Sequence, residues 1–452
     1  MQKILPKNLI SLANRLPTPL YVVGGSVRDF LANLPQPQTL DWDICAPMPA
    51  QEFAQLAQDA GFKVKSVYKN TGTVKLQDTD GVDYEFSSFR SDKYVRGEHT
   101  PSQIYFTNDI SLDCRRRDFT CNAIYYDVKR NEYVDPLDGI SAVKEKRLTT
   151  VAPADKVFGE DGLRLMRLAR QTATLGFSPD TDCLLGAKKN SALICDISPE
   201  RIYSELSAIL LADQKYGVRK GHYEGLKILE KTGVLAHILP ELALGKDMAQ
   251  RPDYHKYDVL EHSFRAVLYA PPSVRLASLL HDVGKPYCTI RDGNAHNHPE
   301  DGARIAEEIL TRLKAPKKTV NAVKTLVRLH MYDFNCQTGE NKLRRFFVTH
   351  YSVLEDLLLL KQADFSACTD DLTKAPTVEK WQTLLEKMRL EKVPFTLKEL
   401  AVSGTDLLSL GLPNHTLAQT LHELLLHVAV RPKDNEKQRL LRLAPKFCIR
   451  SL

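Results

Sequence analysis

The sequence predicts an α+β protein in which a head built on a mixed sheet precedes a long helical body. Up to about residue 150, short runs of β-branched and aromatic residues alternate with turns such as TDG and KRNE, as is typical of strands. From Asp155 onward, apolar residues recur at the spacing of amphipathic helices. With 452 residues the chain is too long for one ordinary core, so we expect roughly three domains.

The composition is that of a globular protein, with 43% hydrophobic and 26% charged residues, and its net charge of +6 permits nucleic-acid binding. The nine cysteines are scattered and never spaced as C-x-x-C, so neither a disulfide framework nor a cysteine zinc site is expected. The N-terminus lacks a continuous apolar segment, and no later run is long enough to cross a bilayer. We therefore expect a cytoplasmic location and no membrane partner.

Two aspartates flank a tryptophan in the predicted strand DWDIC. Because successive strand residues point to opposite faces, Asp41 and Asp43 project together while Trp42 turns into the core. Carboxylates this close repel unless a cation lies between them, and oxygen ligands favour Mg²⁺. On the later strand DYEF, Glu85 offers a third carboxylate to the same metals. Acidic pairs are common on protein surfaces, so this pair gains weight only from its context.

A paired glycine supplies that context. Gly24 and Gly25 free the backbone for close approach to a triphosphate, and Ser26 adds a hydroxyl. Arg28 opens the following helix with a charge suited to phosphate oxygens. The turn and the aspartate pair together predict the two halves of a triphosphate site.

The glycine-serine turn, the two-carboxylate strand and the later carboxylate together resemble the nucleotidyltransferase superfamily that includes DNA polymerase beta. Three further stretches narrow the resemblance. CRRRDFTCNAIYYD resembles the motif R-R-D-F-T-x-N-A, EDGLR resembles E-D-x-x-R, and ISPERIYSEL resembles S-x-E-R-I-x-x-E-L. In this order, the motifs resemble class II tRNA nucleotidyltransferases, the CCA-adding enzymes, and their relatives the bacterial poly(A) polymerases.

The resemblance implies a polymerase-beta-like nucleotidyltransferase head, with a role for each motif. It makes Asp41, Asp43 and Glu85 the catalytic carboxylates, of which Asp41 and Asp43 bind Mg²⁺ as the cofactor. It implies that the nucleotide is bound by Gly24, Gly25, Ser26, Arg28, Arg116, Asp118, Asn122, Asp161, Arg164 and Arg167.

Asp161 and Arg164 offer a physical basis for choosing a nucleotide without a template strand. On a helix, Glu160, Asp161 and Arg164 fall at i, i+1 and i+4, so we expect Asp161 and Arg164 to share a face. A carboxylate accepts from an exocyclic amine and a guanidinium donates to ring acceptors, which suits cytosine and adenine but not uracil and guanine. An isolated E-D-x-x-R would more simply be a helix-stabilising ion pair.

The implied reaction is in-line attack by an RNA 3'-hydroxyl on the α-phosphorus of a nucleoside triphosphate, with release of pyrophosphate. We expect addition of C, C and A to tRNA from CTP and ATP. SVYKNTGTVKL resembles tRNA enzymes rather than the G-[RK]-R-F stretch of poly(A) polymerases. Poly(A) synthesis, A-only or CC-only addition, and an RNA-binding protein with a vestigial transferase site are the alternatives.

Two departures bear on that choice. Gly162 stands where many relatives have proline in E-D-P-x-R, and the expected histidine-proline pair appears as His99-Thr100-Pro101. The divergent segment 89–106 resembles the family's flexible loop, which is associated with the switch from C to A addition. The loop is not obviously truncated, but its divergence means that these departures support nucleotide transfer more strongly than full CCA addition.

A histidine-rich stretch follows the transferase motifs. LLHDVGKP and its flanking histidines resemble the HD metal-dependent phosphohydrolase domain. The resemblance implies a second divalent metal, such as Ni²⁺ or Mn²⁺, because imidazoles and a carboxylate are suitable ligands. It implies either hydrolysis of phosphoesters such as 2',3'-cyclic phosphates or a scaffold for RNA. The expected ligands are His262, His281, Asp282 and His298, completed by Asp333 or His330.

These motifs divide the chain into four expected parts. They are a catalytic head over 1–150, a helical neck with nucleotide-base recognition and RNA-binding helices over 151–237, an HD domain over 238–368 and a tRNA-binding helical tail over 369–452. After Ala429 the tail carries seven Lys or Arg residues, which either face RNA phosphates or form a solvated helix face. The oligomeric state stays open.

Overall fold

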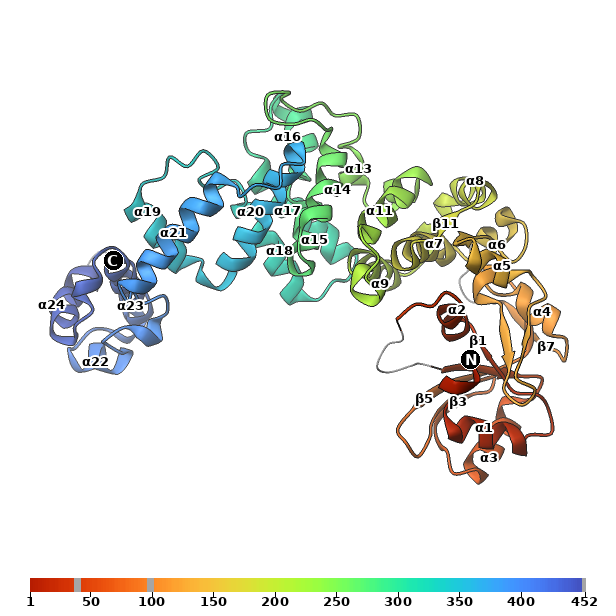
Figure 1. The fold of residues 1–452 in the computed structure, drawn as a ribbon. Helices are drawn as coiled ribbons and strands as arrows, with labels where there is room; N and C mark the ends of the chain where they lie inside the picture. The colour runs from red at the N-terminus through yellow and green to blue at the C-terminus, as the bar shows by residue number, and fades with distance from the viewer. Residues whose placement is uncertain (36–41, 96–100, 449–452) are drawn as a thin grey trace. The chain divides into compact units, whose positions relative to one another are not determined.

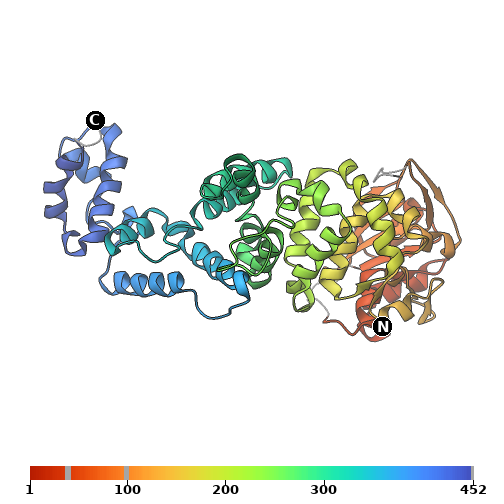
Figure 2. The same ribbon diagram turned by 90° about the horizontal axis from the view of Figure 1, so that it is seen from above.

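The computed structural model describes residues 1–35, 42–95 and 101–448, and the chain divides into two compact units (Figure 1). Unit 1 comprises Met1–Ala243 and Arg312–Lys314, and unit 2 comprises Leu244–Thr311 and Ala315–Leu452. In the described part of the chain, all strands lie in unit 1 and unit 2 is helical (Figure 2). The predicted mixed-sheet head and helical body are therefore confirmed, while the finer four-part division stays a prediction.

A seven-stranded sheet forms the centre of the head. Its strands follow the order β3-β4-β5-β2-β1-β8-β9, and β2 and β5 run parallel whereas the other neighbours are antiparallel. Because the short parallel pair lies in the middle, residues far apart in the sequence come into direct register. The strands are β1 (Tyr21–Val23), β2 (Trp42–Ala46), β3 (Lys63–Tyr68), β4 (Thr73–Gln77), β5 (Asp83–Ser88), β8 (Tyr125–Asp127) and β9 (Glu132–Val134).

Period-two alternation decides which side chains of the sheet enter the core. Trp42 and Tyr84 are buried, whereas their neighbours Asp43 and Glu85 are exposed. On the buried side, Phe53 of α3 stacks on Phe86 with 3.7 Å between ring centroids. Helices α1 (Lys7–Arg15), α2 (Gly25–Leu31) and α3 (Ala50–Asp59) belong to this part of the head.

The rest of unit 1 joins the sheet to a set of helices. A two-stranded ribbon, β6 (Arg90–Lys93) with β7 (Gln103–Phe106), precedes α4 (Ile110–Arg115), the 3-10 turn η2 (Thr120–Asn122) and α5 (Gly139–Lys144). The short strands β10 (Arg147–Leu148) and β11 (Ser178–Pro179) pair in parallel. The helices are α6 (Ala154–Glu160), α7 (Leu163–Leu175), α8 (Thr181–Lys189), α9 (Pro199–Leu210), α10 (Asp213–Tyr216), α11 (Gly221–Lys231), α12 (Val234–Ile238) and α13 (Pro240–Ala243).

Unit 2 is built from packed helices. Helices α14 and α20 pack closely along each other, and α15 and α18 pack beside them. Further along the chain, Trp381 is fully buried among Tyr332, Phe346 and Phe347. The helices are α14 (Val259–Tyr269), α15 (Arg275–Leu280), α16 (Gly284–Asp292), α17 (His298–Arg312), α18 (Lys317–Leu329), α19 (Glu340–Thr349), α20 (Leu354–Thr369), α21 (Pro376–Leu390), α22 (Gly404–Ser409), α23 (Leu417–Val430) and α24 (Lys437–Cys448).

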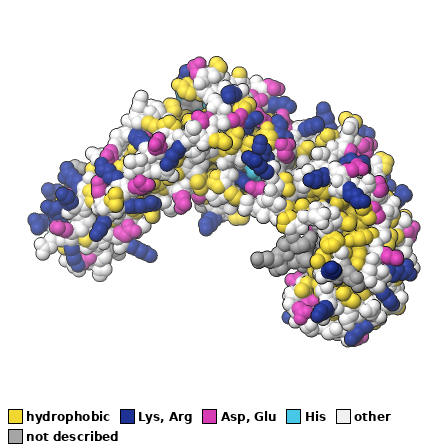
Figure 3. Space-filling model, viewed as in Figure 1, with side chains coloured by type: hydrophobic (Ala, Val, Ile, Leu, Met, Phe, Trp, Pro, Cys, Tyr) yellow, Lys and Arg dark blue, Asp and Glu magenta, His cyan; other side chains and the backbone are white. Residues whose placement is uncertain are grey.

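Two surface properties of the chain bear on its partners. No helix within the described residues is long and apolar enough to cross a membrane. Figure 3 shows Lys and Arg side chains gathered over the C-terminal helices α22 to α24. From Arg431 onward, the exposed Lys and Arg residues of the described chain are Arg431, Lys433, Lys437, Arg439, Arg442 and Lys446.

Candidate functional site

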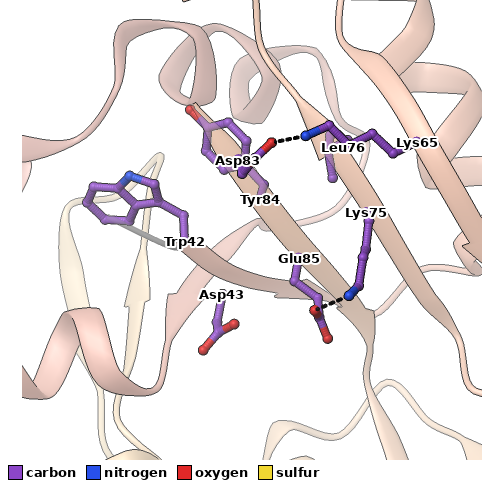
Figure 4. A pocket seen from close by; sticks show the side chains of 8 residues that line it. All are labelled: Trp42, Asp43, Lys65, Lys75, Leu76, Asp83, Tyr84 and Glu85. Atoms are coloured by element: carbon purple, nitrogen blue, oxygen red, sulfur yellow. Dashed lines mark hydrogen bonds and ion pairs between the residues drawn. The ribbon is translucent and has the colours of Figure 1, made fainter. Parts of the chain in front are cut away.

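The exposed face of the central strands carries a row of charged side chains. Asp43 on β2 lies directly opposite Glu85 on the parallel strand β5, and Glu85 lies opposite Lys75 on β4. Lys75 Nζ lies 3.6 Å from Glu85 Oε2, and the side chains of both are about half exposed. These three residues line a cavity of about 340 Å³ (Figure 4). The first predicted carboxylate, Asp41, lies outside the described residues.

The glycine turn lies against Asp43. Gly24 has φ +80°, and a Cβ built there would lie 3.1 Å from Asp43 Oδ2. Glycine is therefore needed both for the backbone conformation and for the close approach to the carboxylate. Asp43 and Glu85 offer oxygen donors on one face, which is the ligand chemistry that Mg²⁺ prefers. The residues present thus fit the predicted metal.

A second cavity, of about 400 Å³, is rich in positive charge. Asp43, Asp118 and Asp161 are its only acidic lining residues among the described part of the chain. A surplus of guanidinium groups over carboxylates suits a polyanion such as a triphosphate. The cationic lining residues are Arg28, Arg116, Arg117, Arg164, Arg167, Arg170 and Lys215.

This cavity brings together nearly all the nucleotide-binding residues that the sequence predicts. The exception is Ser26, which is 7% exposed and does not line the cavity. Its Oγ is buried and has no hydrogen-bond partner among the described residues. The predicted residues that do line the cavity are Gly24, Gly25, Arg28, Arg116, Asp118, Asn122, Asp161, Arg164 and Arg167.

Arg28 is the centre of a buried hydrogen-bond network. Its Nε and Nη2 donate to Asp29 Oδ1 at 2.8 and 2.6 Å, and its Nη1 donates to Asn122 Oδ1 at 2.5 Å and Gln171 Oε1 at 3.2 Å. Tyr216 Oη donates to the other oxygen of Asp29. Arg28 is only 5% exposed. It therefore ties α2 to α7 and α10 as well as lining the cavity.

Asp118 extends this network to a second arginine. Its Oδ2 accepts from Arg167 Nε at 2.8 Å and Nη2 at 2.5 Å, and its Oδ1 accepts from Asn122 Nδ2 at 2.9 Å. Burial opposes ionisation, but the Arg167 guanidinium and these hydrogen bonds hold the pKa of Asp118 well below its usual range. Asp118 is thus a fixed anion that orients Arg167 within the cavity.

The chain breaks its helix at the residues expected to recognise the base. Helix α6 ends at Glu160, Asp161 is extended with φ −144° and ψ 108°, and α7 begins at Leu163. The expectation that Asp161 and Arg164 share one continuous helix face is therefore wrong. A Cβ at Gly162 would lie 2.4 Å from the Leu193 carbonyl oxygen, so packing requires glycine at this break.

Asp161 and Arg164 nevertheless line the same cavity. Arg164 is 4% exposed and donates to the backbone carbonyls of Val157 at 3.0 Å and Arg116 at 2.7 Å. Its guanidinium carbon lies 5.5 Å from the centroid of the Tyr94 ring. Burial raises the pKa of Asp161. These contacts hold the arginine in one orientation in the cavity that Asp161 also lines.

Asp113 is a site residue that sequence reasoning missed. It is fully buried and accepts from Arg116 Nε at 2.7 Å, Arg117 Nη2 at 3.2 Å, Tyr125 Oη at 2.5 Å and the backbone N–H of Arg90 at 3.2 Å. Burial opposes ionisation, but the two arginines lower its pKa to about 2. Its spacing from the arginines, at i+3 and i+4, was the available signal.

A second cluster lies in unit 2, where α14, the end of α15, the start of α17 and the end of α18 meet. Asp282 lies between two pairs of histidines: its Oδ2 is 3.4 Å from His262 Nε2 and 3.3 Å from His281 Nε2, and its Oδ1 is 3.3 Å from His298 Nε2 and 3.6 Å from His330 Nε2. All five residues are buried. We call them the HD cluster.

The protonation of the rings shows whether a metal fits there. Nδ1 of His298 and of His330 lies 2.7 and 2.6 Å from a backbone carbonyl, so in each neutral ring Nδ1 carries the proton and Nε2 the lone pair. The two Nε2 atoms nevertheless lie 3.2 Å apart. Lone pairs at this distance repel, and a shared cation removes the repulsion. The cluster therefore fits a divalent metal bound by imidazole and carboxylate.

The prediction that Asp333 is a ligand of the HD metal site is corrected by the structure. Its carboxylate accepts from Trp381 Nε1 at 2.9 Å, Lys380 Nζ at 3.1 Å and the backbone N–H of Thr338 at 2.7 Å, so it supports the neighbouring core. The carboxylate that lies beside the cluster is instead that of Asp364 on α20, whose Oδ1 lies 3.1 Å from His262 Nε2. His330, the other expected candidate, does lie in the HD cluster.

Fold and site together define a nucleotidyltransferase head joined to an HD-type helical unit. The family model of the poly(A) polymerase head domain matches residues 20–149, that of the probable RNA- and SrmB-binding site of polymerase A matches 176–244, and that of the HD domain matches 254–360. The chain belongs to the tRNA nucleotidyltransferase and poly(A) polymerase family. The predicted family resemblance is confirmed.

Several relatives are similar over most of the chain. The A-adding tRNA nucleotidyltransferase of Deinococcus radiodurans is 30% identical, with 86% of this chain and 84% of the relative covered. The CC-adding tRNA nucleotidyltransferase of Thermus thermophilus is 29% identical, with 87% and 85% covered. The CCA-adding enzyme of Bacillus stearothermophilus, solved with CTP, shares the fold with a TM-score of 0.68 at 23% identity, covering 98% of each chain.

Proposed function

We propose that the protein is a Mg²⁺-dependent, template-independent tRNA nucleotidyltransferase that adds C, C and A to tRNA 3' ends from CTP and ATP and releases pyrophosphate. The observation that carries the proposal is the register of Asp43 with Glu85 beside an arginine-lined cavity that also contains Asp161 and Arg164. These proposed substrates also support the expected cytoplasmic location.

The residues of the head have distinct tasks in the proposed reaction. Arginines of the cavity bind the triphosphate, and Asp118 keeps Arg167 oriented toward it. Asp161 accepts from the exocyclic amine of cytosine or adenine, while Arg164 donates to a ring acceptor. Bound Mg²⁺ would supply the charge that lowers the pKa of the attacking hydroxyl and offsets that of pyrophosphate. The proposed ligands are Asp41, Asp43 and Glu85.

A-only or CC-only addition is the second candidate, because relatives with each activity match the chain at nearly equal identity. The ribbon of β6 and β7 supports full CCA addition, since it lies in the segment that resembles the loop associated with switching from C to A.

Sequencing of tRNA 3' ends after incubation with CTP, ATP or both separates full CCA addition, CC-only addition and A-only addition. The test uses four transcripts, which end before the CCA, after one C, after two C, or after the complete CCA. Full addition converts the shortest transcript to CCA with both triphosphates and stops there. Extension that ends at CC, or that begins only after CC, supports the partial enzymes, and a long A tail supports poly(A) synthesis. No extension of any transcript overturns the proposal.

We also propose that the HD cluster binds a divalent metal such as Ni²⁺ or Mn²⁺ and hydrolyses phosphoesters such as a 2',3'-cyclic phosphate on RNA. Support comes from the converging Nε2 lone pairs of His298 and His330. Metal analysis and hydrolysis assays on a cyclic end test it, with His330→Ala as the variant expected to lose activity. A metal-free protein without hydrolysis favours a scaffold.

A further inference from the structure

A third group of potential ligands adjoins the HD cluster. One ligand atom each from His255, His262 and Cys368 lies within 4.8 Å of the other two. Cys368 follows Asp364 by one helical turn on α20, and His262 lies on α14, which packs along α20. His255 precedes α14, and its ring centroid lies 4.9 Å from that of His262. The packing of two helices thus brings a thiol to two imidazoles.

The histidines of this group differ from the other cluster histidines. Nδ1 of His281, His298 and His330 each lies within hydrogen-bond distance of a backbone carbonyl. In contrast, the Nδ1 atoms of His255 and His262 are buried and have no hydrogen-bond partner among the described residues. The whole His262 side chain is buried. A buried polar atom without a partner is costly, so a ligand is expected to satisfy it.

The charge of Lys285 lies near His255. Lys285 itself is anchored 2.6 Å from Asp282 Oδ2 and 2.7 Å from Gln250 Oε1, so carboxylate charge offsets its own.

We propose that His255, His262 and Cys368 form a thiol-containing site for a borderline-soft divalent cation such as Zn²⁺. Thiolate and imidazole donors select Zn²⁺, Co²⁺ or Ni²⁺ over Mg²⁺ and Mn²⁺, which prefer oxygen ligands. On binding, the metal–sulfur bond forms as the thiol proton leaves to solvent. The site lacks the carboxylate of the HD cluster, shares only His262 with that cluster and is independent of nucleotidyl transfer.

His262 links this site to the HD cluster. A neutral imidazole has a single lone pair, so His262 serves one cation at a time. A cation at the thiol site therefore weakens the binding of a cation by His262, His281 and Asp282. By linkage, a cation bound by those three residues weakens binding at the thiol site equally. Zn²⁺ at the thiol site would act as an inhibitor of a metal-loaded HD cluster.

Co²⁺ is the probe for the test, because thiolate bound to Co²⁺ gives a charge-transfer absorption in the near ultraviolet. Metal-free full-length protein is titrated with Co²⁺. The band is expected in the wild type and in Cys336→Ser, a control at another partly buried cysteine of unit 2, and is expected to be absent in Cys368→Ser. His255→Gln is expected to weaken the cobalt affinity that the band reports by about tenfold or more.

A wild type that binds Co²⁺ without the band, or a Cys368→Ser variant that keeps it, overturns the proposal. Circular dichroism shows whether the variants fold. If Cys368→Ser does not fold, alkylation of the wild type followed by mass spectrometry replaces it: Zn²⁺ is expected to slow modification of Cys368 but not of Cys195, which is exposed. Equal rates with and without Zn²⁺ contradict the site.

Discussion

One row across three strands contains Asp43, Glu85 and Lys75. The electrostatic environment of each side chain is therefore set by its direct cross-strand neighbours. Alternation along the strands places these side chains on the exposed face. Lys75, whose Nζ lies 3.6 Å from Glu85 Oε2, reduces the repulsion between the two neighbouring carboxylates. Catalysis of this kind depends on positioned charge, so single substitutions have specific expected effects.

Asp43→Asn is expected to lower the rate of nucleotide incorporation by about a hundredfold or more, because a positioned charge is lost from the reacting centre. Affinity for tRNA should stay within about twofold of wild type, because the lost charge acts at the reacting centre. Incorporation of radiolabelled CTP and filter binding measure the two quantities. Asp83→Asn is the matched control, since Asp83 lies on β5 and pairs with Lys65. Full activity in Asp43→Asn would contradict the assignment.

Asp113→Asn is expected to raise KM for CTP severalfold, because Arg116 and Arg117 lose the anion that positions them. Removing the charge of the fully buried Asp113 from the partly buried Arg117 should also cost up to about 3 kcal/mol of stability. Steady-state kinetics and denaturant unfolding check both. Asp135→Asn, at the carboxylate that accepts from the backbone N–H groups of Gly139 and Ile140, is the control expected to keep KM unchanged. An unchanged KM in Asp113→Asn would remove its positioning role.

The same carboxylate predicts a pH dependence. The pKa of Asp113 is lowered to about 2 in the folded protein, against about 3.9 for an unfolded aspartate. A lowered pKa contributes stability that is complete above the unfolded value and is lost as pH falls through the folded one. The stability difference between wild type and Asp113→Asn should therefore shrink between about pH 4 and pH 2. Urea unfolding across this range measures it, and a constant difference would contradict the assignment.

Among the elements, the break between α6 and α7 decides where Asp161 and Arg164 lie, the pair that we propose recognises the base. An uninterrupted helix would put Asp161 and Arg164 one turn apart on one face. The break instead leaves Asp161 extended, and its carboxylate accepts from the backbone N–H of Leu163 at 2.9 Å. Close packing of Gly162 against Leu193 maintains this geometry.

Gly162→Ala is expected to destabilise the protein by about 1–3 kcal/mol, since the new methyl group meets the Leu193 carbonyl oxygen and the backbone must shift. The shift should also reduce discrimination between CTP and UTP, measured as a ratio of kcat/KM values. Gly159→Ala on α6 is the matched control. The nearest atom to its Cβ lies 3.5 Å away, so a neutral or stabilising effect is expected there. Equal effects of the two substitutions would argue against packing at the break.

At the scale of the whole molecule, each unit carries a chemically different site. Unit 1 presents carboxylates beside arginines, which suits a nucleoside triphosphate, whereas unit 2 presents imidazoles around Asp282, which suits a divalent metal. The exposed Lys and Arg residues of α24 add a surface suited to RNA phosphates (Figure 3).

Arg442→Ala combined with Lys446→Ala is expected to weaken tRNA binding. The slope of log K against log salt concentration should also become shallower by about one to two, because each lost phosphate contact removes roughly one released counterion. KM for CTP should not change, since neither residue lines the arginine-rich cavity of the head. Binding measured at several salt concentrations checks this. Lys129→Ala with Arg130→Ala removes the same charge from the exposed β8–β9 turn of the head and should have a smaller effect.

Local sequence patterns were enough to predict the main elements and the faces to which their side chains point. Alternation in DWDIC and DYEF indicated that Trp42 is buried while Asp43 and Glu85 face solvent, and the ordered motifs indicated the family. These inferences depend on local periodicity and on residue chemistry at short spacing, which the chain carries without reference to its distant parts.

The packing of the fold, and not the local sequence pattern, sets which distant side chains meet. Asp364 lies at the HD cluster and Asp333 does not, although both follow the histidine motif, because helix packing selects between them. Burial of Arg28 within a network that reaches Gln171 and Tyr216 likewise depends on how α2 packs against α7 and α10. Contacts between residues far apart in sequence arise from the packing of whole elements, and local periodicity does not specify that packing.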